Sequence, residues 1–246
     1  MRKLIIANWK MNKLRRESLL FIQNLALQNE VEVAIAAPVL SISELKTMAG
    51  AKQIKIGAQT MSEHAHGAYT GEISASMLRD VGCDFVLLGH SERRNLFLES
   101  NEVITKKVER AVVENMPFVL CVGETLSQRE MGQTEEVLSH MLEEALSSLI
   151  GPSYRLVTIA YEPVWAIGTG KVASKEIILQ THAFIKNKLK EIAGDAAGNI
   201  RILYGGSVES KNIKEILSIP NVDGALVGGA SLEALSFNQL ISEAVV

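Results

Sequence analysis

Eight short runs of apolar, largely β-branched residues recur along the chain. Most of them are near-continuous rather than alternating in polarity, which is typical of parallel strands that are buried on both faces. A fold for this chain must therefore cover both sides of eight strands. The runs are residues 4–7, 31–37, 54–58, 85–88, 118–122, 156–160, 200–203 and 224–227.

Stretches with helical periodicity lie between most of these runs, each with one apolar stripe against a charged face. Strands and helices alternate without a Ser/Pro-rich linker or a change of composition, which indicates a series of βα units in one domain. Eight such units predict an α/β protein, a single (β/α)8 TIM barrel spanning residues 1–246. The clearest stripes are Ile104, Val108, Ala111 and Val112; Leu138, Leu142, Ala145 and Leu149; and Ile178, Ile185, Leu189 and Ile192.

A doubly wound open sheet is the alternative fold. It would usually carry a glycine-rich dinucleotide-binding turn after its first strand, whereas Asn8-Trp9-Lys10 follows the first run here. Composition fits either fold, because 47% of the 246 residues are hydrophobic and 22% are charged, which is ample for a large core.

Charge and composition exclude several classes of partner. The net charge of −3 and the lack of a Lys/Arg run argue against nucleic acid and against a membrane surface. Asn8 and Lys10 interrupt the apolar start before it reaches the length of a signal peptide. Cys83 and Cys121 have no CxxC spacing, so we expect buried, reduced thiols and a cytoplasmic protein.

Polar residues and glycines follow five of the apolar runs. In a barrel the carboxyl ends of all strands open onto one mouth, so these groups are expected to meet there. Each has a structural explanation by itself: a solvated strand end, a helix N-cap at Ser91, or a glycine turn. None of these explanations accounts for why all five groups stand at the carboxyl end of a predicted strand. The groups are Asn8 and Lys10, His90 to Glu92, Glu162, Gly205 to Ser207, and Gly228 with Gly229.

The glycine pairs after the seventh and eighth runs predict a phosphate site, where backbone N–H groups receive an anion. Ser207 adds a hydroxyl donor, and Lys10 can offset the charge of the ligand. Glu162 can take a proton from a carbon next to a carbonyl if an electrophile stabilises the enediolate. Asn8, Lys10 and His90 are the candidates. A helix that starts after His90 favours its neutral imidazole.

The stretch YEPVWAIGTG, residues 161–170, predicts a mobile cover. An enediolate that bears a phosphate can eliminate it in water, so the site needs to close during the reaction. Residues 163–165 are expected to form a stiff hinge, 166–170 the moving tip and 171–173 the return hinge. Gly168 would let the backbone N–H approach the phosphate.

These motifs together resemble the triosephosphate isomerase family over essentially the whole chain. They occur in order, each at the end of a predicted strand. They are ANWKMN (7–12), GAQ (57–59), GAYTGE (67–72), GHSERR (89–94), CVGE (121–124), AYEPVWAIGTGK (160–171), YGGSV (204–208) and VGGASL (227–232).

The resemblance implies that Glu162 moves a proton between two carbons of dihydroxyacetone phosphate and D-glyceraldehyde 3-phosphate, in glycolysis and gluconeogenesis. It implies that Asn8, Lys10 and His90 polarise the carbonyl, with Glu92 supporting Lys10. The implied phosphate ligands are Gly168, Ser207, Gly228 and Gly229, and Tyr204 would latch the closed lid. No metal and no organic cofactor are implied.

The resemblance also implies a homodimer, formed through a loop at about 61–73 in which Thr70 reaches the partner's site. The alternative is a loop without a partner. His64 and His66 lack a third metal ligand at suitable spacing, which favours surface histidines. The chain departs from the family pattern at four positions that are expected to affect packing, capping or lid rates rather than the reaction: Leu98 for glycine, Asn101 for aspartate, Val172 for threonine and Lys175 for proline.

Two other functions remain open at this point. A barrel aldolase would use Lys10 as a Schiff base, although strand alternation puts Lys10 in a polar setting with Asn8 and Asn12. A phosphosugar-binding protein could keep the fold without turnover. Retention of Asn8, Lys10, His90 and Glu162 together favours the isomerase.

Overall fold

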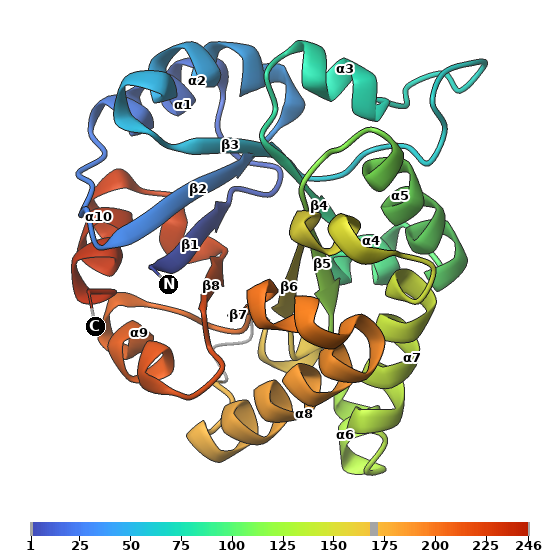
Figure 1. Ribbon diagram of the computed structural model, residues 1–246. Helices are drawn as coiled ribbons and strands as arrows, with labels where there is room; N and C mark the ends of the chain where they lie inside the picture. The colour runs from blue at the N-terminus through green and yellow to red at the C-terminus, as the bar shows by residue number, and fades with distance from the viewer. Residues whose placement is uncertain (1, 168–171, 246) are drawn as a thin grey trace.

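Eight parallel strands close into a barrel, in chain order, within residues 2–167 and 172–245, which the computed structural model describes (Figure 1). The strands are β1 Lys3–Asn8, β2 Val31–Ala37, β3 Lys55–Ala58, β4 Phe85–Leu88, β5 Phe118–Val122, β6 Val157–Tyr161, β7 Arg201–Tyr204 and β8 Gly224–Val227. The predicted (β/α)8 barrel is confirmed, and the eight predicted runs match these strands to within one residue at each end. The open-sheet alternative is wrong, because β1 also pairs with β8, for example Ala7 with Val227.

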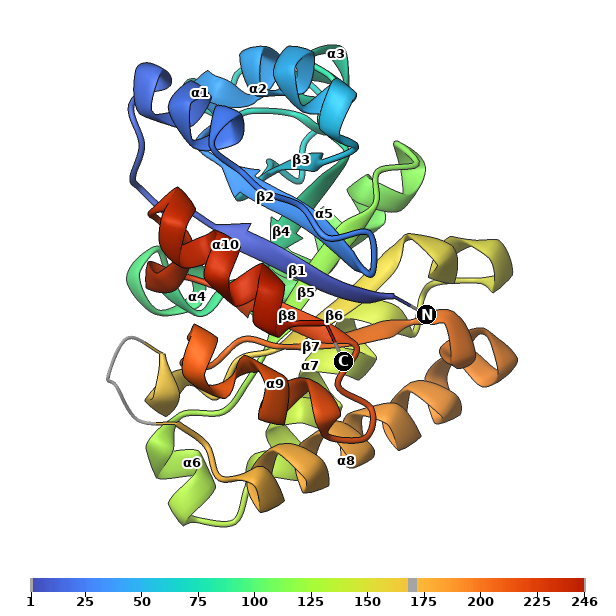
Figure 2. The same ribbon diagram turned by 90° about the vertical axis from the view of Figure 1, so that its left-hand side faces the viewer.

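Helices surround the barrel and cover its outer face (Figures 1 and 2). The α-helices are α1 Arg15–Gln23, α2 Ile42–Ala49, α3 Ala75–Asp80, α4 Ser91–Leu96, α5 Asn101–Val113, α6 Leu126–Glu130, α7 Thr134–Leu146, α8 Lys175–Ala193, α9 Ser210–Ser218 and α10 Ala234–Glu243. Short 3-10 turns are η1 Val39–Ser41, η2 Gly50–Lys52, η3 Gly151–Leu156, η4 Val164–Ala166, η5 Gly194–Asn199 and η6 Gly229–Ser231. In the described part of the chain, no helix is both long and apolar enough to cross a membrane.

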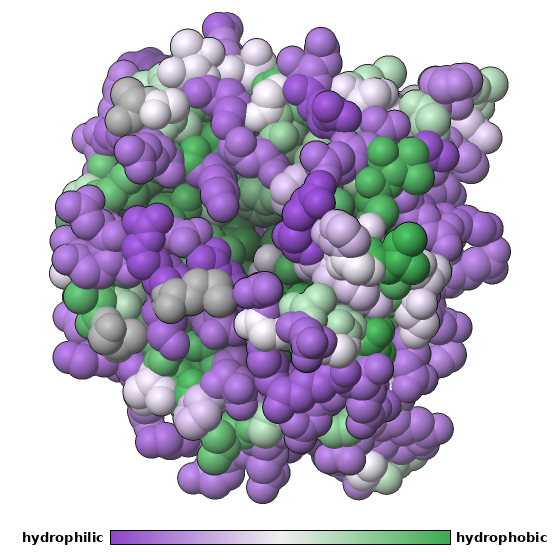
Figure 3. Space-filling view, viewed as in Figure 1, coloured by the Kyte–Doolittle hydropathy of each residue, from purple (hydrophilic) through white to green (hydrophobic). Residues whose placement is uncertain are grey.

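Both faces of the strands are buried, which explains the near-continuous apolar runs. In β1, Leu4 and Ile6 belong to a core cluster inside the barrel, whereas Ile5 and Ala7 belong to the larger core beneath the helices. Figure 3 shows the face on which the N-terminus lies, largely hydrophilic with apolar residues in a central hollow. The opposite end of the barrel, where the strands finish, carries the candidate site.

Strand alternation continues past the end of the core. Side chains two residues apart share a face of a strand, so Asn8 follows Ile6 into the barrel interior. In the same way Glu162 follows the interior residue Ala160 of β6. The fold thereby aims both side chains at one space above the interior core.

Candidate active site

A cavity of about 530 Å³ opens at the carboxyl ends of the strands. Its lining brings together most of the residues singled out from the sequence: Asn8, Lys10, His90, Glu162, Ser207, Gly228 and Gly229. Glu92 contacts Lys10 from beside the cavity, and Thr70 lies exposed in the loop after β3. Gly168, with the rest of 168–171, lies outside the described residues.

Glu162 is 3% exposed and packs closely against backbone. Its Oε1 lies 3.2 Å from Nε2 of His90, and its Oε2 accepts a hydrogen bond from the Ser91 N–H at 3.3 Å. A Cβ on Gly205 would lie 2.7 Å from Cγ of Glu162, and one on Gly123 would lie 1.8 Å from its carbonyl oxygen. The glycines at these two strand ends are therefore required by the close approach of Glu162.

His90 is itself the N-cap of α4. The expectation that Ser91 caps this helix is wrong, because Nδ1 of His90 accepts the Glu92 N–H at 3.2 Å. A neutral ring that accepts at Nδ1 carries its proton on Nε2. That nitrogen faces the Glu162 carboxylate. The cap thus fixes the orientation of the ring relative to the cavity.

Lys10 holds a left-handed backbone conformation, with φ of +52°. The Asn8 Oδ1 accepts its N–H at 3.1 Å, and Nε2 of Gln59 donates to its carbonyl at 2.8 Å. Its ammonium group forms a 2.6 Å ion pair with Glu92. The role of Gln59 was missed from the sequence, although the GAQ motif contains it, because the contact joins β1 to the end of β3.

Glycine-rich turns after β7 and β8 also line the cavity. A Cβ on Gly228 would lie 3.5 Å from Cε of Lys10, so the turn after β8 closely approaches the lysine. The Ser207 hydroxyl donates to the carbonyl of Ala166 at 2.7 Å, which ties it to the first residue of the predicted moving tip. A ligand that takes up this hydroxyl must compete with that bond.

Tyr204 lies beneath the Gly206 turn, where a Cβ would come within 2.2 Å of its hydroxyl oxygen. Within the described residues that hydroxyl has no hydrogen-bond partner. Burial raises the pKa of Tyr204 to about 12, and the backbone of Ala173 partly offsets the rise. Tyr204 therefore lies beside the return segment of the predicted lid.

Glu124 anchors the start of the predicted lid, a role that was missed from the sequence. Its fully buried Oε1 accepts from the Tyr161 hydroxyl at 3.1 Å, Trp165 Nε1 at 3.0 Å and Arg129 Nη1 at 3.1 Å. Glu124 also holds the hinge backbone, since its carbonyl accepts the Val164 N–H at 3.1 Å. The CVGE motif, which ends at Glu124, was the sequence signal that could have indicated this role.

Within residues 2–167 and 172–245, no three His, Cys, Asp or Glu side chains are grouped so that they could hold a metal ion. His64 instead stacks on Tyr69, with ring centroids 3.7 Å apart and an interplanar angle of 4°. The donor groups at the cavity are an ammonium, an imidazole, an amide and backbone. They fit an anionic organic ligand.

Comparison with known proteins decides the family. The family model described as triosephosphate isomerase matches residues 3–244. The chain belongs to the triosephosphate isomerase family. Proteins named triosephosphate isomerase from Thermodesulfovibrio yellowstonii and Alkaliphilus metalliredigens are 44% and 45% identical to it over 98% of this chain, and over 98% and 100% of their own lengths. One from Francisella tularensis subsp. mediasiatica is 45% identical over 99% of this chain and 98% of its own.

The departures from the triosephosphate isomerase pattern have distinct structural settings. Leu98 has a φ of +57°, the left-handed region that favours glycine. Asn101 begins α5 and accepts a hydrogen bond from Arg94 Nη1 at 2.5 Å. Lys175 is the first residue of α8, a position that tolerates proline, and Val172 is exposed.

Proposed function

We propose that the chain interconverts dihydroxyacetone phosphate and D-glyceraldehyde 3-phosphate, with Glu162 as the base, and so serves glycolysis and gluconeogenesis. The observation that carries the proposal is the buried pair of Glu162 and His90, 3.2 Å apart, on the cavity that Lys10 also lines. A base and an electrophile on the same small cavity are what a proton transfer next to a carbonyl requires.

In the proposed reaction the Glu162 carboxylate takes a proton from the carbon next to the carbonyl and returns it to the neighbouring carbon. His90 Nε2–H, the Asn8 amide and Lys10 donate to the oxygens as negative charge develops on them. The neutral form of His90 is supported by the hydrogen bond that Nδ1 accepts. Glu92 holds Lys10 in place, and side chains alone carry the protons.

The phosphate is proposed to bind at Ser207, Gly228 and Gly229, which line the cavity, and at Gly168, which lies outside the described residues. Closure of the segment after Pro163 would exclude water from the enediolate. The bond from Ser207 to Ala166 supports a link between phosphate binding and this segment. Tyr204, whose buried hydroxyl lacks a partner in the described part of the chain, is the proposed latch.

The base assignment predicts that Glu162→Gln lowers kcat by roughly 10³-fold, because the amide cannot accept the proton. A coupled isomerisation assay in both directions measures it. Glu209→Gln is the matched control, since Glu209 lines the same cavity but has no proposed role. A Glu162→Gln variant with near-normal kcat, or an equal loss in the control, would refute the assignment.

The ion pair of Lys10 with Glu92 argues against a Schiff-base aldolase. A Schiff-base lysine usually lies in an apolar pocket, whereas the Lys10 Nζ lies 2.6 Å from a carboxylate oxygen of Glu92. Borohydride reduction in the presence of dihydroxyacetone phosphate is therefore expected to add no mass to the protein. Turnover in the isomerisation assay separates the isomerase from a binding protein that has only kept the fold.

We also propose a cytoplasmic homodimer. The loop 61–73 projects from the barrel (Figure 1), with Thr70 exposed in it, and Met11 and Phe97 are large apolar side chains that are mostly exposed. The two buried free thiols support a reducing compartment. Sedimentation equilibrium is expected to give twice the 26.8 kDa mass of the chain. Thr70→Arg should lower that mass toward one chain, whereas a monomeric parent protein would contradict the proposal.

A further inference from the structure

Charged side chains form the lowest layer of the barrel interior, at the end where the strands begin. Alternation places Glu32 and Arg201 on the interior face, because each stands two residues before a member of the interior core, Ala34 and Leu203. Arg2 precedes β1 and Lys55 begins β3, and a nitrogen of each lies within 4 Å of the Glu32 carboxylate. Three cations therefore meet one carboxylate beneath the apolar interior.

Glu32 is the acidic side chain that these cations share. Arg201 takes up both of its oxygens, with hydrogen bonds of 2.9 Å from Nη1 to Oε2 and 2.7 Å from Nη2 to Oε1. The hydrogen bond from Arg201 holds the pKa of the Glu32 carboxyl below its usual range. Arg2 Nε and Lys55 Nζ stay 3.8 and 3.9 Å from the same oxygens. Since one carboxylate cannot neutralise three cations, positive charge is left over at Arg2 and Lys55.

Arg2 and Lys55 also keep hydrogen-bond donors for a ligand. Nη1 of Arg2 donates to the Asn29 carbonyl at 3.0 Å, which holds the arginine side chain in place. Within residues 2–167 and 172–245, no hydrogen bond occupies Nη2 of Arg2 or Nζ of Lys55. The two side chains are 56% and 61% exposed, so both donors can be reached from solvent.

A cavity of about 420 Å³ lies at these two cations, and Glu32 is the acidic residue among the described residues that line it. Lys52 adds a third positive charge to the lining, although its Nζ donates to three carbonyls at the end of α1, at 2.8 to 3.2 Å. Amide side chains supply neutral donors; they belong to Gln28, Asn29 and Gln53. The lining is therefore rich in donors and in positive charge.

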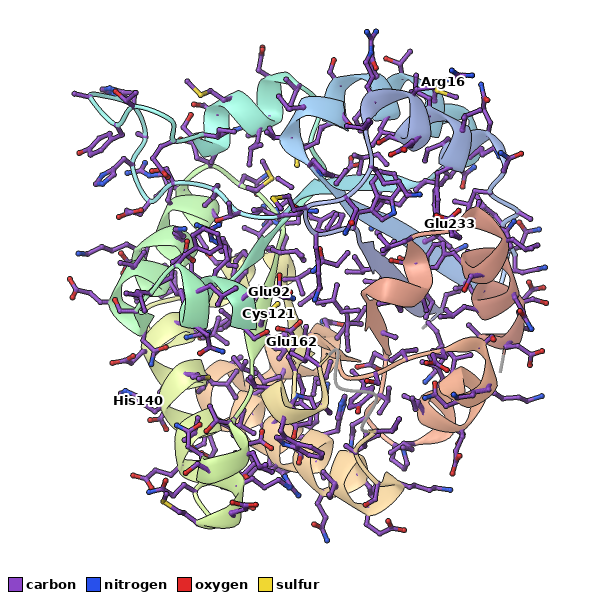
Figure 4. All side chains as sticks on the ribbon, turned by 180° about the vertical axis from the view of Figure 1, so that it is seen from behind. Arg16, Glu92, Cys121, His140, Glu162 and Glu233 are labelled. Carbon is purple, nitrogen blue, oxygen red and sulfur yellow. The ribbon has the colours of Figure 1, made fainter. Side chains whose placement is uncertain are left out.

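This cavity and the candidate active site lie at opposite ends of the barrel. Figure 3 looks onto the end where the strands begin, where hydrophilic residues surround a hollow. Figure 4 views the molecule from behind, and there Glu162 is labelled near the middle of the barrel. Of the described residues, none lines both cavities.

The donor set selects a phosphate-bearing anion. A guanidinium fork matches phosphate oxygens, and an ammonium binds a second anionic group as a point charge. Arg2 and Lys55 approach different oxygens of Glu32, so they flank it and can each receive one such group. The whole chain has a net charge of −3, so this positive charge is a local feature rather than a general one.

We propose that the cavity at the amino-terminal end of the barrel binds a small molecule that carries a diphosphate group, held by Arg2 and Lys55. The pair of Glu32 and Arg201 forms the floor of the site. The volume leaves room for an organic part beside the diphosphate, next to the amides of the lining. The site is independent of the reaction proposed at the other end.

The test is a TROSY NMR titration of the full chain with inorganic pyrophosphate at low ionic strength. Backbone amides of residues 28–33 and 52–55 report on this cavity, and those of residues 206–208 and 228–230 report on the candidate active site. The first set is expected to saturate with one ligand per chain and a dissociation constant below about 1 mM. Shifts confined to the active-site amides, or no saturation by about 10 mM, would refute the proposal.

The double variant Arg2→Gln with Lys55→Gln should raise this dissociation constant by about tenfold or more, because both charged donors are lost. Lys106→Gln with Lys214→Gln is the matched control, since it removes the same charge from exposed positions of α5 and α9. The control should bind within about twofold of the parent protein. An equal loss in both double variants would mean a general attraction of anions and would overturn the site.

Two further measurements separate the ligand class and the two ends of the barrel. Orthophosphate should bind at the lower cavity at least about tenfold more weakly than pyrophosphate, because it cannot engage both cations. Equal affinities would overturn the assignment of a diphosphate. The kcat of Arg2→Gln with Lys55→Gln in the isomerisation assay should stay within about twofold of the parent. A parallel loss of kcat would contradict two separate sites, whereas failure of the base assignment at Glu162 would leave this proposal standing.

Discussion

Two residues with a Cβ, Lys10 and Leu98, share a left-handed backbone conformation but differ in what accompanies it. The strain at Lys10, with φ of +52°, is held by hydrogen bonds from Gln59 and to Asn8, and the residue lines the cavity. Leu98, with φ of +57°, is 81% exposed, and in the described part of the chain no comparable hydrogen bonds hold its backbone. A left-handed residue costs about 1–2 kcal/mol when it carries a Cβ. At Lys10 the strained backbone belongs to a residue that lines the cavity, whereas at Leu98 the strain has no structural explanation.

Leu98→Gly is therefore expected to stabilise the fold by about 0.5–1 kcal/mol, because relief of the strain exceeds the added entropy of the unfolded glycine. Urea unfolding at one chain concentration measures the change. Leu96→Gly is the control: Leu96 is also largely exposed, at 74%, but helical, and its replacement should cost up to about 1 kcal/mol. Destabilisation by both substitutions would contradict the prediction.

At the scale of elements, the strands and their polar ends could be predicted from the sequence because one rule governs both. Burial on two faces makes each strand an apolar run, and the first polar residue or glycine marks its end. Alternation then carries Asn8 and Glu162 into the cavity. These steps use only local order and the closure of the barrel.

The contacts that orient the site could not be predicted in this way. The His90 cap depends on a ring nitrogen reaching an N–H two residues later, whereas serine is the usual residue at such a position. The contacts of Gln59 and Glu124 join segments far apart in the chain. Their partners follow from how the strand ends pack, which no local pattern encodes.

The predicted hinge depends on one carboxylate oxygen that accepts three hydrogen bonds. Glu124→Gln removes the charge and replaces one oxygen by a donor, so it should cost about 2–3 kcal/mol of stability. It should also change the fluorescence of Trp165, which donates to that oxygen. Glu130→Gln, at an exposed position of α6, is the control. Unchanged emission and stability would mean that Glu124 does not anchor the hinge.

At the scale of the whole molecule, one buried histidine makes stability depend on pH. His182 on α8 is fully buried beside Tyr161 and Tyr204, and its Nδ1 lies 3.0 Å from the Asn221 carbonyl. Burial lowers its pKa from 6.5 to about 4. Between these two pH values the unfolded chain binds a proton that the folded chain does not, so lowering the pH favours unfolding.

This linkage predicts a loss of about 3 kcal/mol of unfolding free energy between pH 6.5 and pH 4 from His182 alone. His182→Asn keeps a donor near the Asn221 carbonyl but cannot titrate. Its unfolding free energy in urea should fall less steeply over that range than that of the parent protein. Parallel curves would rule out His182 as the source. A single transition in these curves would also support the prediction that residues 1–246 form one domain.

The pairing of β1 with β8 gives the ring of strands no structural beginning. Each strand pairs with a neighbour on both sides, and the first strand, β1, lies near the last helix, α10, in both ribbon views (Figures 1 and 2). The closed barrel therefore does not determine at which connection between its strands the chain is opened. Circular permutants, with the old ends joined by a short linker and new ones opened at the exposed turn around Gly132, should reach the same barrel.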